Sequence, residues 1–504
     1  MLVPIGEWLP DQPDYHNPGS SVIHNVYPKT ESSYGPVGGF VAQFSALNAK
    51  AQGAISVTDN SANVYTFTGT ATKLYKTVSL GTFTDISGAT FATGTNERWS
   101  FAPFGNRMLA TNFANPIQSF TMGSSTTTSD LSATAPKARY MAVVKDFLMV
   151  ANTYDAVGGN QPQQVWWSAI NDCTNWPAIG SLAAAQVQSD QQVIPGDQGW
   201  IQGLVGNLGT ADVAVFFERS IWRGTYIGSP NIFSFAPAEG ARGTPAPGSI
   251  VQLGAVVFYL GVDGFYMFDG SNSTPIGAQK IDKWFYSDVA QAYLYNITSS
   301  IDPINKLVFW SYPGTGSSNG IPNRLIIFNW AVNRWSVVDM SVELIFKSMT
   351  YGYTLDGLDA TGYTMETLPF SLDSRIWTGG ALVLSAFDSN HKMGYLSGTT
   401  LPVTVETSES EPGVNQDPSK IGNLVLIKSA KPLVDGGTPS VSIATRNRLM
   451  DGWTYNAPVS INQYGDCPQR IAGRFIRAQI TMNAGDSFTH ISGVDITIQP
   501  QGTR

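Results

Sequence analysis

The sequence predicts an all-β protein: a β-propeller built of hairpin blades, with an extended N-terminal arm and a small C-terminal β-sandwich-like domain. Three observations predict this fold. Aromatic residues make up 12% of the 504 residues, Gly (50) and Pro (29) punctuate the whole chain, and a hairpin-like unit recurs along it. Short aromatic strands bounded by turn residues are typical of hairpin sheets. Radial repetition buries such sheets without long unpaired edges.

Residues 1–45 are predicted to form an arm rather than a domain. They carry Pro at positions 4, 10, 13, 18, 28 and 36. Because Pro lacks a backbone donor and fixes its own backbone angle, it interrupts helices and sheets. We therefore expect an extended segment without regular secondary structure, of the kind that docks on a neighbouring molecule.

Residues 46–400 carry the repeat and are assigned to the propeller. Each unit has a strand ending in a polar turn and then an aromatic strand, as in ISVTDNSANVYTFTGTATKLYKT (55–77) and GAVVFYLGVDGFYMFDG (254–270). The irregular spacing mostly falls near the length of a four-stranded blade. In FNWAVNRWS, the tetrad 331–334 suits a tight hairpin because Asn tolerates left-handed backbone geometry. A stack of separate β-sandwiches remains the alternative, since sandwiches also give short, regularly spaced strands.

Helical periodicity is nearly absent from the chain. The best candidate lies in 274–297, where Ile281, Trp284, Phe285 and Val289 share one side. This pattern predicts a short helix that decorates a blade.

Residues 401–504 are predicted to form a separate sheet or sandwich domain. They open with an acidic, Pro-bearing stretch that reads as a linker and continue with alternating strands. In RFIRAQI (474–480), Ile476, Ala478 and Ile480 face one side and Arg477 lies on the opposite, polar face. This alternation predicts a half-buried strand.

The charge pattern argues against tight binding to nucleic acid. The formal net charge is -8, only 13% of residues are charged, and Lys and Arg form no long run. An acidic surface repels the phosphate backbone, which suits a wall that DNA slides past. The first residues show no signal peptide, and the best apolar run (253–262) is too short for a membrane helix. We expect synthesis in a cytoplasm and no membrane insertion by this chain.

The residues that usually carry chemistry are scattered. Cys173 and Cys467 have no metal-binding spacing and are expected to be unlinked thiols. The four histidines lack a partner at ligand spacing, and neither a G-x-S-x-G elbow nor a phosphate-binding loop occurs. We therefore predict no catalytic residues, no cofactor and no metal. The histidines, expected at the surface or in turns, are His16, His24, His391 and His490.

Two carboxylate pairs are candidates for a glycosidase site, because such enzymes use two acids a few ångströms apart. They are Asp263 with Asp269 and Glu218 with Glu239. The two Asp residues each precede a Gly, a position that turn chemistry explains without any catalytic role. A structural interpretation is therefore favoured.

The most distinctive loop is EGARGTPAPGSIV (239–251). Gly240, Gly243 and Gly248 alternate with two Pro around Arg242, which predicts a bent, pinned backbone rather than a phosphate cradle. Arg242 is a candidate clamp for a carboxylate between blades or between subunits, although a structural role is favoured.

Two stretches interrupt the hairpin pattern. They are the Ser/Thr tract 123–136 and the Tyr/Gly/Thr stretch 350–367. Insertions in repeat folds often emerge together on a contact face, while the alternative is that both are flexible surface loops. We expect 350–367 to be a constriction or tip element.

Several segments together resemble one known family. They are LPDQPDYHNPGSSVIHNVYPKTESSYGPV, APKARYMAVVKDFLMVAN, VWWSAINDCTNWP, EGARGTPAPGSIV and GVDGFYMFDGSNSTPIG. They look like the packaged-DNA stabilisation proteins of short-tailed bacteriophages. The C-terminal GRFIRAQITMNAGDSFTHISGVDI is similar to the end of tail nozzle and tubular tail proteins of the same viruses. The matches fall on scaffold positions, among them Trp166, Asp263 and Gly264, so no catalytic residue is carried over.

The resemblance implies a structural virion protein. Such proteins form a ring, usually of six copies, below the portal and its adaptor. The ring continues and closes the DNA channel, retains packaged DNA, gives passage to DNA during ejection and anchors tail fibres or spikes. The alternative is a propeller that recognises or cleaves host-surface glycan, which would need paired acids in a cleft rather than a docking segment and a non-sticky wall.

Overall fold

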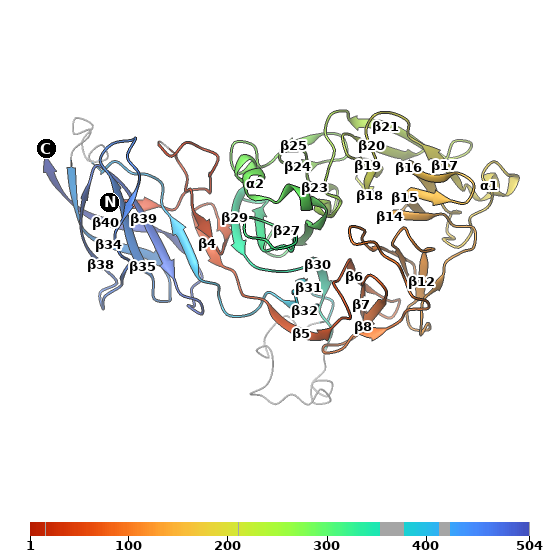
Figure 1. Ribbon diagram of the computed structural model, residues 1–504, viewed down its shortest axis with the longest axis horizontal. Helices are drawn as coiled ribbons and strands as arrows, with labels where there is room; N and C mark the ends of the chain where they lie inside the picture. The colour runs from red at the N-terminus through yellow and green to blue at the C-terminus, as the bar shows by residue number, and fades with distance from the viewer. Residues whose placement is uncertain (16, 210, 353–376, 378, 413–423, 503–504) are drawn as a thin grey trace.

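The computed structural model describes residues 1–502 except 16, 210, 353–376, 378 and 413–423. Two bodies lie side by side in Figure 1: a ring of small sheets, and a sheet domain (blue) beyond one edge of the ring. Over the described part of the chain, no helix has both the length and the apolar character needed to cross a membrane.

The ring is a β-propeller with seven four-stranded blades, counted over the described residues. Within each blade the strands are antiparallel, and the blades are described below from the innermost strand outward. Strands follow one another in sequence within a blade, except in blade 7, whose fourth strand is the N-terminal strand β5. Blade 1 comprises β6 (Ala54–Thr58), β7 (Val64–Gly69), β8 (Leu74–Thr77) and β9 (Thr84–Asp85); blade 2 comprises β10 (Ser100–Phe104), β11 (Arg107–Thr111), β12 (Gln118–Thr121) and β13 (Ser129–Asp130); blade 3 comprises β14 (Lys137–Val144), β15 (Phe147–Asp155), β16 (Gly159–Trp167) and β17 (Asp190–Val193). Blade 4 comprises β18 (Ile201–Leu208), β19 (Ala211–Phe217), β20 (Ile221–Tyr226) and β21 (Phe233–Glu239); blade 5 comprises β22 (Val251–Leu253), β23 (Val256–Leu260), β24 (Phe265–Phe268) and β25 (Ser273–Pro275); blade 6 comprises β26 (Thr298–Asp302), β27 (Leu307–Tyr312), β28 (Arg324–Asn329) and β29 (Arg334–Asp339); blade 7 comprises β30 (Leu344–Met349), β31 (Leu382–Phe387), β32 (Lys392–Tyr395) and β5 (Val41–Ala46).

Aromatic side chains form the layers between blades, which explains the aromatic content of the strands. Edge-to-face and tilted ring pairs of this kind add to the burial energy of large apolar side chains. Examples from four of the seams are Phe67 with Phe120, Trp167 with Phe233, Phe216 with Tyr259 and Phe265 with Trp310, with ring centroids 4.8–5.5 Å apart. The predicted helix is confirmed as α2 (Asp282–Asp288), with Ile281 and Phe285 fully buried.

An N-terminal strand closes the ring. Strand β5 pairs with β32 at the outer side of blade 7, with Gly394 opposite Ala42 and Tyr395 opposite Val41. The pairing brings together residues separated by most of the chain. At Gly394 a Cβ atom would lie only 2.0 Å from the carbonyl oxygen of Val41. The closure therefore requires glycine at this position.

We expect Gly394→Ala to destabilise the protein by about 3 kcal/mol, because the added methyl overpacks a backbone contact that cannot move without losing the strand pair. Chemical denaturation measures the free energy of unfolding of the variant. Gly316→Ala and Gly380→Ala are unsuitable as controls, because both glycines have a positive φ that alanine would strain. Gly452→Ala is the control, since nothing lies within 4 Å of its added Cβ. Equal stability of both variants would contradict the closure role.

The C-terminal domain is a sandwich of two mainly antiparallel sheets. One sheet has the order β3-β4-β40-β34-β38, with β1 also on β40; the other has the order β2-β33-β39-β35-β36, with β37 also on β35. The C-terminal strands are β33 (Val403–Glu406), β34 (Leu424–Val434), β35 (Ser440–Arg446), β36 (Thr454–Tyr455), β37 (Val459–Ser460), β38 (Cys467–Gly473), β39 (Phe475–Met482) and β40 (Ile491–Gly502).

The expectation that residues 1–45 lack regular structure is wrong. This extended segment contributes β1 (Leu2–Pro4), β2 (Ile23–His24), β3 (Val26–Thr30) and β4 (Ser33–Pro36), and it packs on its own chain. Pro4 and Pro36 stand at strand ends, and Pro28 lies in the edge strand β3. These are the sheet positions that tolerate a residue without a backbone donor. These prolines are therefore compatible with the strands that contain them.

The N-terminal segment also joins the two bodies. Strand β2 pairs with β29 of blade 6 on one side and with β33 of the sandwich on the other, so one ten-stranded sheet crosses both. Asn25, with φ of 62°, donates its backbone N–H to Val337 O and its side chain to Pro402 O, and accepts from Asp339 N. A single buried cluster runs from blades 5 and 6 through this segment into the sandwich. The bodies therefore share both a sheet and a core.

Candidate functional site: the propeller channel and its mouth

The innermost strands surround a channel. Cavities of about 420 and 210 Å³ lie in it, and Phe101 and Ile250 line both. We call the end at which the innermost strands begin the channel mouth, and the opposite side of the propeller the exit face. Successive strands in a blade alternate in direction, so the connections from first to second and from third to fourth strand lie at the exit face.

Arg98 spans the channel mouth. It precedes β10 of blade 2, and its guanidinium donates to the backbone oxygens of Tyr295 and Ile297, which precede β26 of blade 6. The Nε–Tyr295 O distance is 3.1 Å and the Nη2–Ile297 O distance is 2.8 Å. Burial lowers the pKa of Arg98 to about 10. The guanidinium therefore bridges blades on opposite sides of the axis and narrows this end of the channel.

Further charged groups ring the mouth, one paired with another blade and one paired within its own blade. The Nζ of Lys50 donates to Asn296 Oδ1 at 3.1 Å, and burial lowers the pKa of Lys50. The carboxylate of Glu343 lies 2.9 Å from Nδ1 of His391, and burial raises the pKa of Glu343. The first contact joins blade 1 to blade 6, and the second joins two segments of blade 7. Polar contacts therefore hold the segments around the mouth in place.

Arg139 forms the most complete ion pair of the mouth. Its Nη2 lies 2.7 Å from Glu97 Oε1, and its Nε lies 3.0 Å from Glu97 Oε2. The guanidinium also stacks over Phe113, with its carbon 4.1 Å from the ring centroid, and lies 5.7 Å from the ring of Trp200. Trp200 is 49% exposed. Paired, stacked groups of this kind hold blades in place and leave one aromatic face at the surface.

We expect Arg98→Met to lower stability by about 2–3 kcal/mol, because two backbone oxygens lose a charged donor inside the mouth. Hydrogen exchange of amides 295–299 should accelerate while exchange in blade 4 stays unchanged. Arg107→Met on the exposed side of β11 in the same blade is the control. Unchanged exchange at 295–299 would show that Arg98 does not hold the mouth.

Arg242 contacts the neighbouring blade, while the carboxylate that it pairs with, Glu239, lies only three residues before it. Arg242 lies between blades 4 and 5, 3.7 Å from Glu239 Oε1 and 5.3 Å from the ring of Tyr266. Glu239 accepts from Ser273 N at 2.6 Å, and Arg242 donates to Ser273 O at 3.4 Å. Together they hold the backbone N–H and carbonyl of one residue of blade 5.

The glycines of the loop 239–251 have different roles. An added Cβ at Gly243 would lie 2.3 Å from Phe217 O, and one at Gly248 would lie 2.0 Å from Ile297 O. At Gly240 nothing lies within 4 Å. The pinned backbone predicted for this loop therefore requires glycine at positions 243 and 248 but not at position 240.

The candidate acid pairs have separate structural partners. Asp269 accepts from the backbone N–H of residues 271 and 272 at 2.8 Å, as turn chemistry predicts. Asp263 differs, because both its oxygens accept from the Tyr266 hydroxyl at 2.9 Å. Glu218 accepts from Gln202 at 3.1 Å, whereas Glu239 pairs with Arg242.

The histidines and cysteines have local roles. His24 lies 3.6 Å from Asp339, and His490 Nδ1 lies 2.9 Å from the Ser33 hydroxyl, while His16 lies outside the described residues. Cys173 and Cys467 are buried free thiols, as expected. Within the described ranges, no group of His, Cys, Asp and Glu could hold a metal ion.

The two interrupting stretches have different outcomes. The Ser/Thr tract 123–136 is not an insertion, because it supplies the outer strand β13 of blade 2 and buries Thr128 and Leu131. The sequence pattern did not indicate this short edge strand, because its residues are mostly hydroxyl-bearing rather than alternately apolar. The stretch 350–367 lies, from residue 353 onward, outside the described residues.

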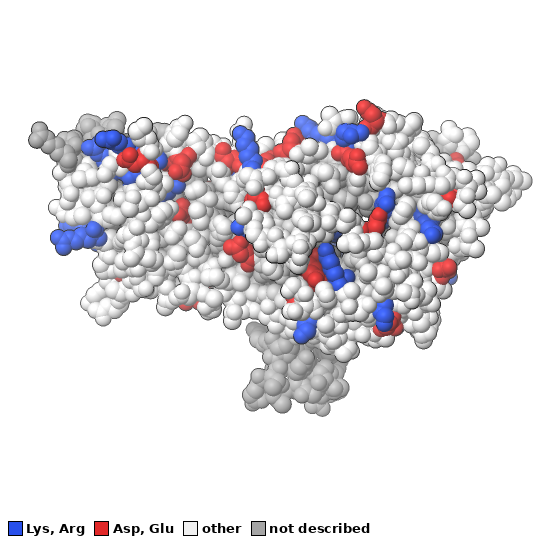
Figure 2. Space-filling model, in the orientation of Figure 1, with Lys and Arg blue, Asp and Glu red and all other residues white. Residues whose placement is uncertain are grey.

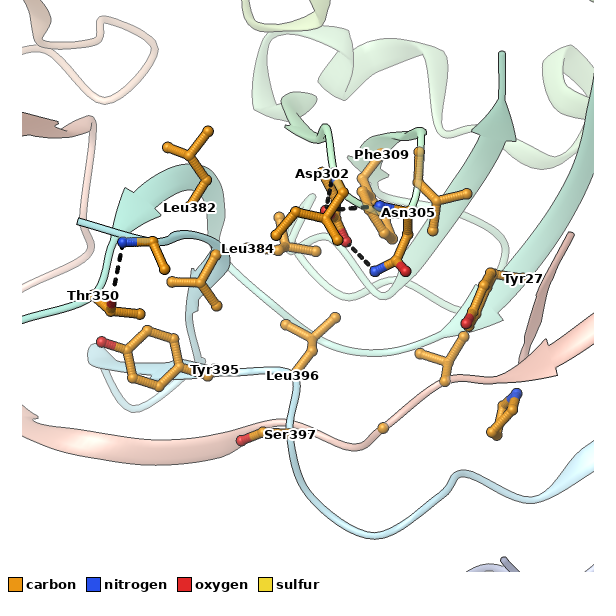
Figure 3. A pocket seen from close by; sticks show the side chains of 17 residues that line it. Tyr27, Asp302, Asn305, Phe309, Thr350, Leu382, Leu384, Tyr395, Leu396 and Ser397 are labelled. Atoms are coloured by element: carbon orange, nitrogen blue, oxygen red, sulfur yellow. Dashed lines mark hydrogen bonds between the residues drawn. The ribbon is translucent and has the colours of Figure 1, made fainter. Parts of the chain in front are cut away.

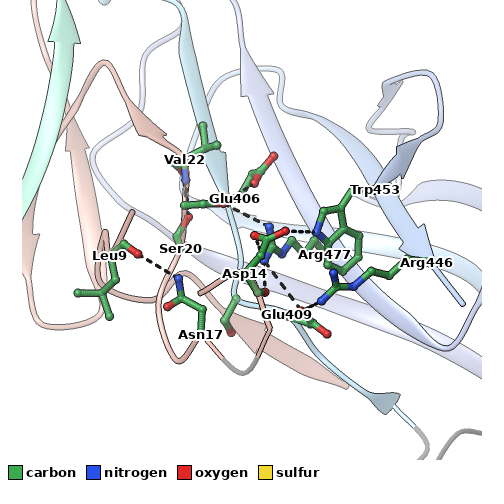
Figure 4. Close-up of polar contacts among 12 residues, drawn as sticks. Leu9, Asp14, Asn17, Ser20, Val22, Glu406, Glu409, Arg446, Trp453 and Arg477 are labelled. Carbon is green, nitrogen blue, oxygen red and sulfur yellow. Dashed lines mark hydrogen bonds and ion pairs between the residues drawn. The ribbon is translucent and has the colours of Figure 1, made fainter. Parts of the chain in front are cut away.

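A second cluster of charges, missed from the sequence, lies in the C-terminal domain (Figure 4). Arg446 and Arg477 have side chains only 3% and 5% exposed, and both guanidinium carbons lie within 4.5 Å of the Trp453 ring centroid. Arg446 pairs with Glu409 at 2.5 Å and Arg477 with Asp14 at 2.8 Å.

The alternation predicts a half-buried strand, but Arg477, on the face opposite Ile476, is buried as well. The N-terminal segment covers that face, and its Asp14 accepts from both Arg477 and the indole N–H of Trp453. Burial opposes ionisation of Asp14, but the hydrogen bond and charge of Arg477 lower its pKa. Isolated arginines within apolar strands, as in RFIRAQI, were the sequence signal for such a cluster.

Comparisons with known proteins identify no family. No protein-family model and no curated protein matches the chain. Among solved structures, the computationally designed Ika8 protein is similar at 8% identity, covering 71% of this chain and 99% of its own, with a TM-score of 0.35. A chain from a structure of the Mitotic Checkpoint Complex is similar at 10% identity, covering 69% of this chain and 95% of its own, with a TM-score of 0.38. Similarity at this level carries no argument about function.

Proposed function

We propose that this chain is a structural virion protein, a subunit of the tail nozzle or hub ring of a short-tailed bacteriophage. In that role it lies below the portal and adaptor, continues and closes the DNA channel, and retains packaged DNA. It anchors tail fibres or spikes and gives passage to DNA during ejection. The ring contains several copies, six by analogy with the family that the sequence resembles. The chain acts without catalysis or cofactor and is made in the host bacterial cytoplasm.

The observation that carries the proposal is the continuous joint between propeller and sandwich. Blade 6, β2 and β33 belong to one sheet, and one buried cluster crosses the joint. Two domains joined only by a linker would rotate relative to each other. A channel wall that confines DNA needs subunits that keep their shape, and this joint supports that use.

The propeller channel itself is not the path of DNA in this proposal. Its cavities of about 420 and 210 Å³ hold a few side chains at most, and Arg98 narrows the mouth. A DNA duplex would therefore run beside the propellers, through an opening that several copies surround. This agrees with a ring subunit and gives the propeller a structural task.

The surface charge fits a wall that DNA does not adhere to. On the face in Figure 2, Lys and Arg lie scattered, several of them next to Asp or Glu, and form no stripe. Several basic residues are committed to ion pairs, among them Lys73 with Asp85 and Lys145 with Asp212. With a net charge of -8, phosphate groups are repelled rather than held.

Recognition or cleavage of host-surface glycan is the second candidate, and one observation favours it. Trp200 presents a half-exposed indole at the channel mouth, next to the pair of Arg139 and Glu97. An exposed aromatic face beside polar groups suits stacking against a flat ligand.

A phage carrying an early stop codon in this gene tests the proposal. Particles grown with and without a suppressor host are imaged by electron microscopy, and the DNA content of each head is measured. We expect emptied heads that lack the lower tail without suppression, and complete, filled particles with it. Filled heads with complete tails that fail to attach to cells would overturn the nozzle assignment and favour glycan recognition.

A further inference from the structure

One connection in the propeller forms an anchored projection. In blade 3, residues 168–189 link the third and fourth strands, whereas blade 4 makes the same connection with 227–232. The base of the projection is held by the indole of Trp176, which donates to Cys173 O at 2.7 Å, and by Trp167, which donates to Gln188 O at 3.0 Å. Trp176 and Cys173 are buried in the core between blades 2 and 3. The projection is therefore an ordered part of the blade.

The tip of the projection is apolar and exposed. It contains helix α1 (Leu182–Val187), which the Ser181 hydroxyl caps by accepting from Ala184 N at 3.1 Å. Leu182 is 76% exposed, and Ala183 and Ala185 are exposed beside it. Residues 173–189 carry no charged side chain. This anchored, uncharged projection presents Leu182 and two alanines at its surface, where a second molecule can bury them.

An apolar cavity of about 480 Å³ lies between blades 6 and 7 and the N-terminal segment (Figure 3). Leu382, Leu384 and Leu396 face it, with Phe309 on the opposite wall. Among the described residues that line it, Asp302 alone is charged, and its carboxylate already accepts from Asn305 and from the N–H of Ile304. The cavity suits an uncharged, apolar occupant of a few side chains.

The projection and the cavity occupy complementary places in the ring. Blade 3 lies across the axis from the seam between blades 6 and 7 (Figure 1). The β16–β17 connection and the β26–β27 turn at Asp302 both lie at the exit face, because strands alternate in direction within each blade. A projection on one side and a cavity on the other, at the same face, are what a head-to-tail contact between identical copies needs.

We propose that α1 of one copy inserts into the cavity between blades 6 and 7 of a second copy. This proposal rests on the proposed function only in taking a second copy of the chain as the partner. Leu182 and its alanine neighbours fill the apolar cavity, and Ile304, 47% exposed at the rim, packs against the helix. Because the two surfaces differ, each bound pair retains one free projection and one free cavity, so the contact propagates from copy to copy until a ring closes.

Three variants of the full chain test the contact by sedimentation velocity. Leu182→Asp places a charge on the projection, where an acidic residue in the first turn is compatible with the helix. Ile304→Asp places one at the cavity rim. Val262→Asp, at a 65% exposed position between β23 and β24 near the channel mouth, is the matched control. Thermal unfolding of each variant verifies the fold.

We expect wild type and Val262→Asp to assemble, and Leu182→Asp and Ile304→Asp each to associate about tenfold or more weakly, as for a charge introduced at the centre of an apolar contact. A mixture of the two weakened variants is decisive. Each retains one intact surface, so the mixture forms one-to-one dimers and nothing larger.

Three outcomes would overturn the proposal. They are a wild-type chain that remains monomeric at every concentration, assembly of Leu182→Asp or Ile304→Asp equal to that of wild type, and a mixture without dimers. None of them changes the outcome of the stop-codon experiment, so failure of this contact and failure of the nozzle role are distinguishable.

Discussion

Asp282→Asn is expected to stabilise the protein at pH 8 by about 4 kcal/mol and to leave stability at pH 4 nearly unchanged. Asp282 is only 8% exposed, at the start of α2, and its Oδ1 accepts from Phe265 N at 3.1 Å. Burial, with a smaller contribution from the charges of Asp11 and Asp263, raises the pKa of Asp282 to about 7. Asn keeps the acceptor and carries no charge.

The direction of this pH effect follows from proton binding. In the unfolded chain an Asp has a pKa of about 3.9, so between about pH 4 and 7 the folded protein binds the extra proton. Folding stability therefore falls as pH rises through this window, and the whole penalty is present above pH 7. Urea denaturation at pH 4 and pH 8 measures both ends.

Asp269→Asn is the matched control with the opposite sign. Hydrogen bonds from the backbone N–H of Asn272 and Ser271 lower the pKa of Asp269, so its charge contributes stability above about pH 4. The control should lose stability at pH 8. If Asp282→Asn were no more stable than wild type at pH 8, burial would not be holding a proton on this carboxyl.

Trp8→Ala is expected to destabilise the protein by about 3–5 kcal/mol and to loosen the joint between the two bodies. Trp8 is fully buried, its indole donates to Ser21 O at 3.1 Å, and its ring meets Trp284 edge to face at 4.7 Å. It belongs to the buried cluster that the propeller and the sandwich share. Removing it leaves a cavity at that joint, which the surrounding strands can only partly fill.

Equilibrium denaturation followed by both fluorescence and hydrogen exchange measures this effect. We expect faster exchange in α2, in β2 and in β40, while blade 3 is unchanged. Tyr464→Ala, at a 74% exposed aromatic position of the sandwich, is the control and should remain within about 0.5 kcal/mol of wild type. Exchange that rises equally in all blades would show that Trp8 supports the whole fold and not the joint in particular.

Interactions between residues close in sequence made the propeller predictable. Asn333 adopts the left-handed conformation expected for its hairpin, with φ of 54°, and α2 buries the side that its apolar spacing marked. Turn chemistry and side-chain periodicity act between residues close in sequence. The blades follow from these signals because each blade is made of neighbouring strands.

Contacts between distant residues could not be predicted in this way. Arg98 binds carbonyl groups that precede blade 6, and Arg477 binds Asp14 near the start of the chain. An isolated arginine in an apolar strand signals that it has a partner, but the sequence does not identify that partner, because any carbonyl or any carboxylate would serve. For the same reason the prolines of residues 1–45 indicated an unstructured arm, while the pairing of those residues with C-terminal strands decided otherwise.

The N-terminal strands also impose an order on synthesis. Strand β1 pairs with β40, β2 with β33, and β5 with β32, so segments translated early wait for partners translated late. Blades 1 to 5 can form while the chain is emerging, since their strands are consecutive. The ring and the sandwich are completed only at the end, when the most distant contacts form at the greatest loop-closure cost. A chain that ends before β40 therefore lacks the partner of β1 and leaves strand edges unpaired, which favours aggregation.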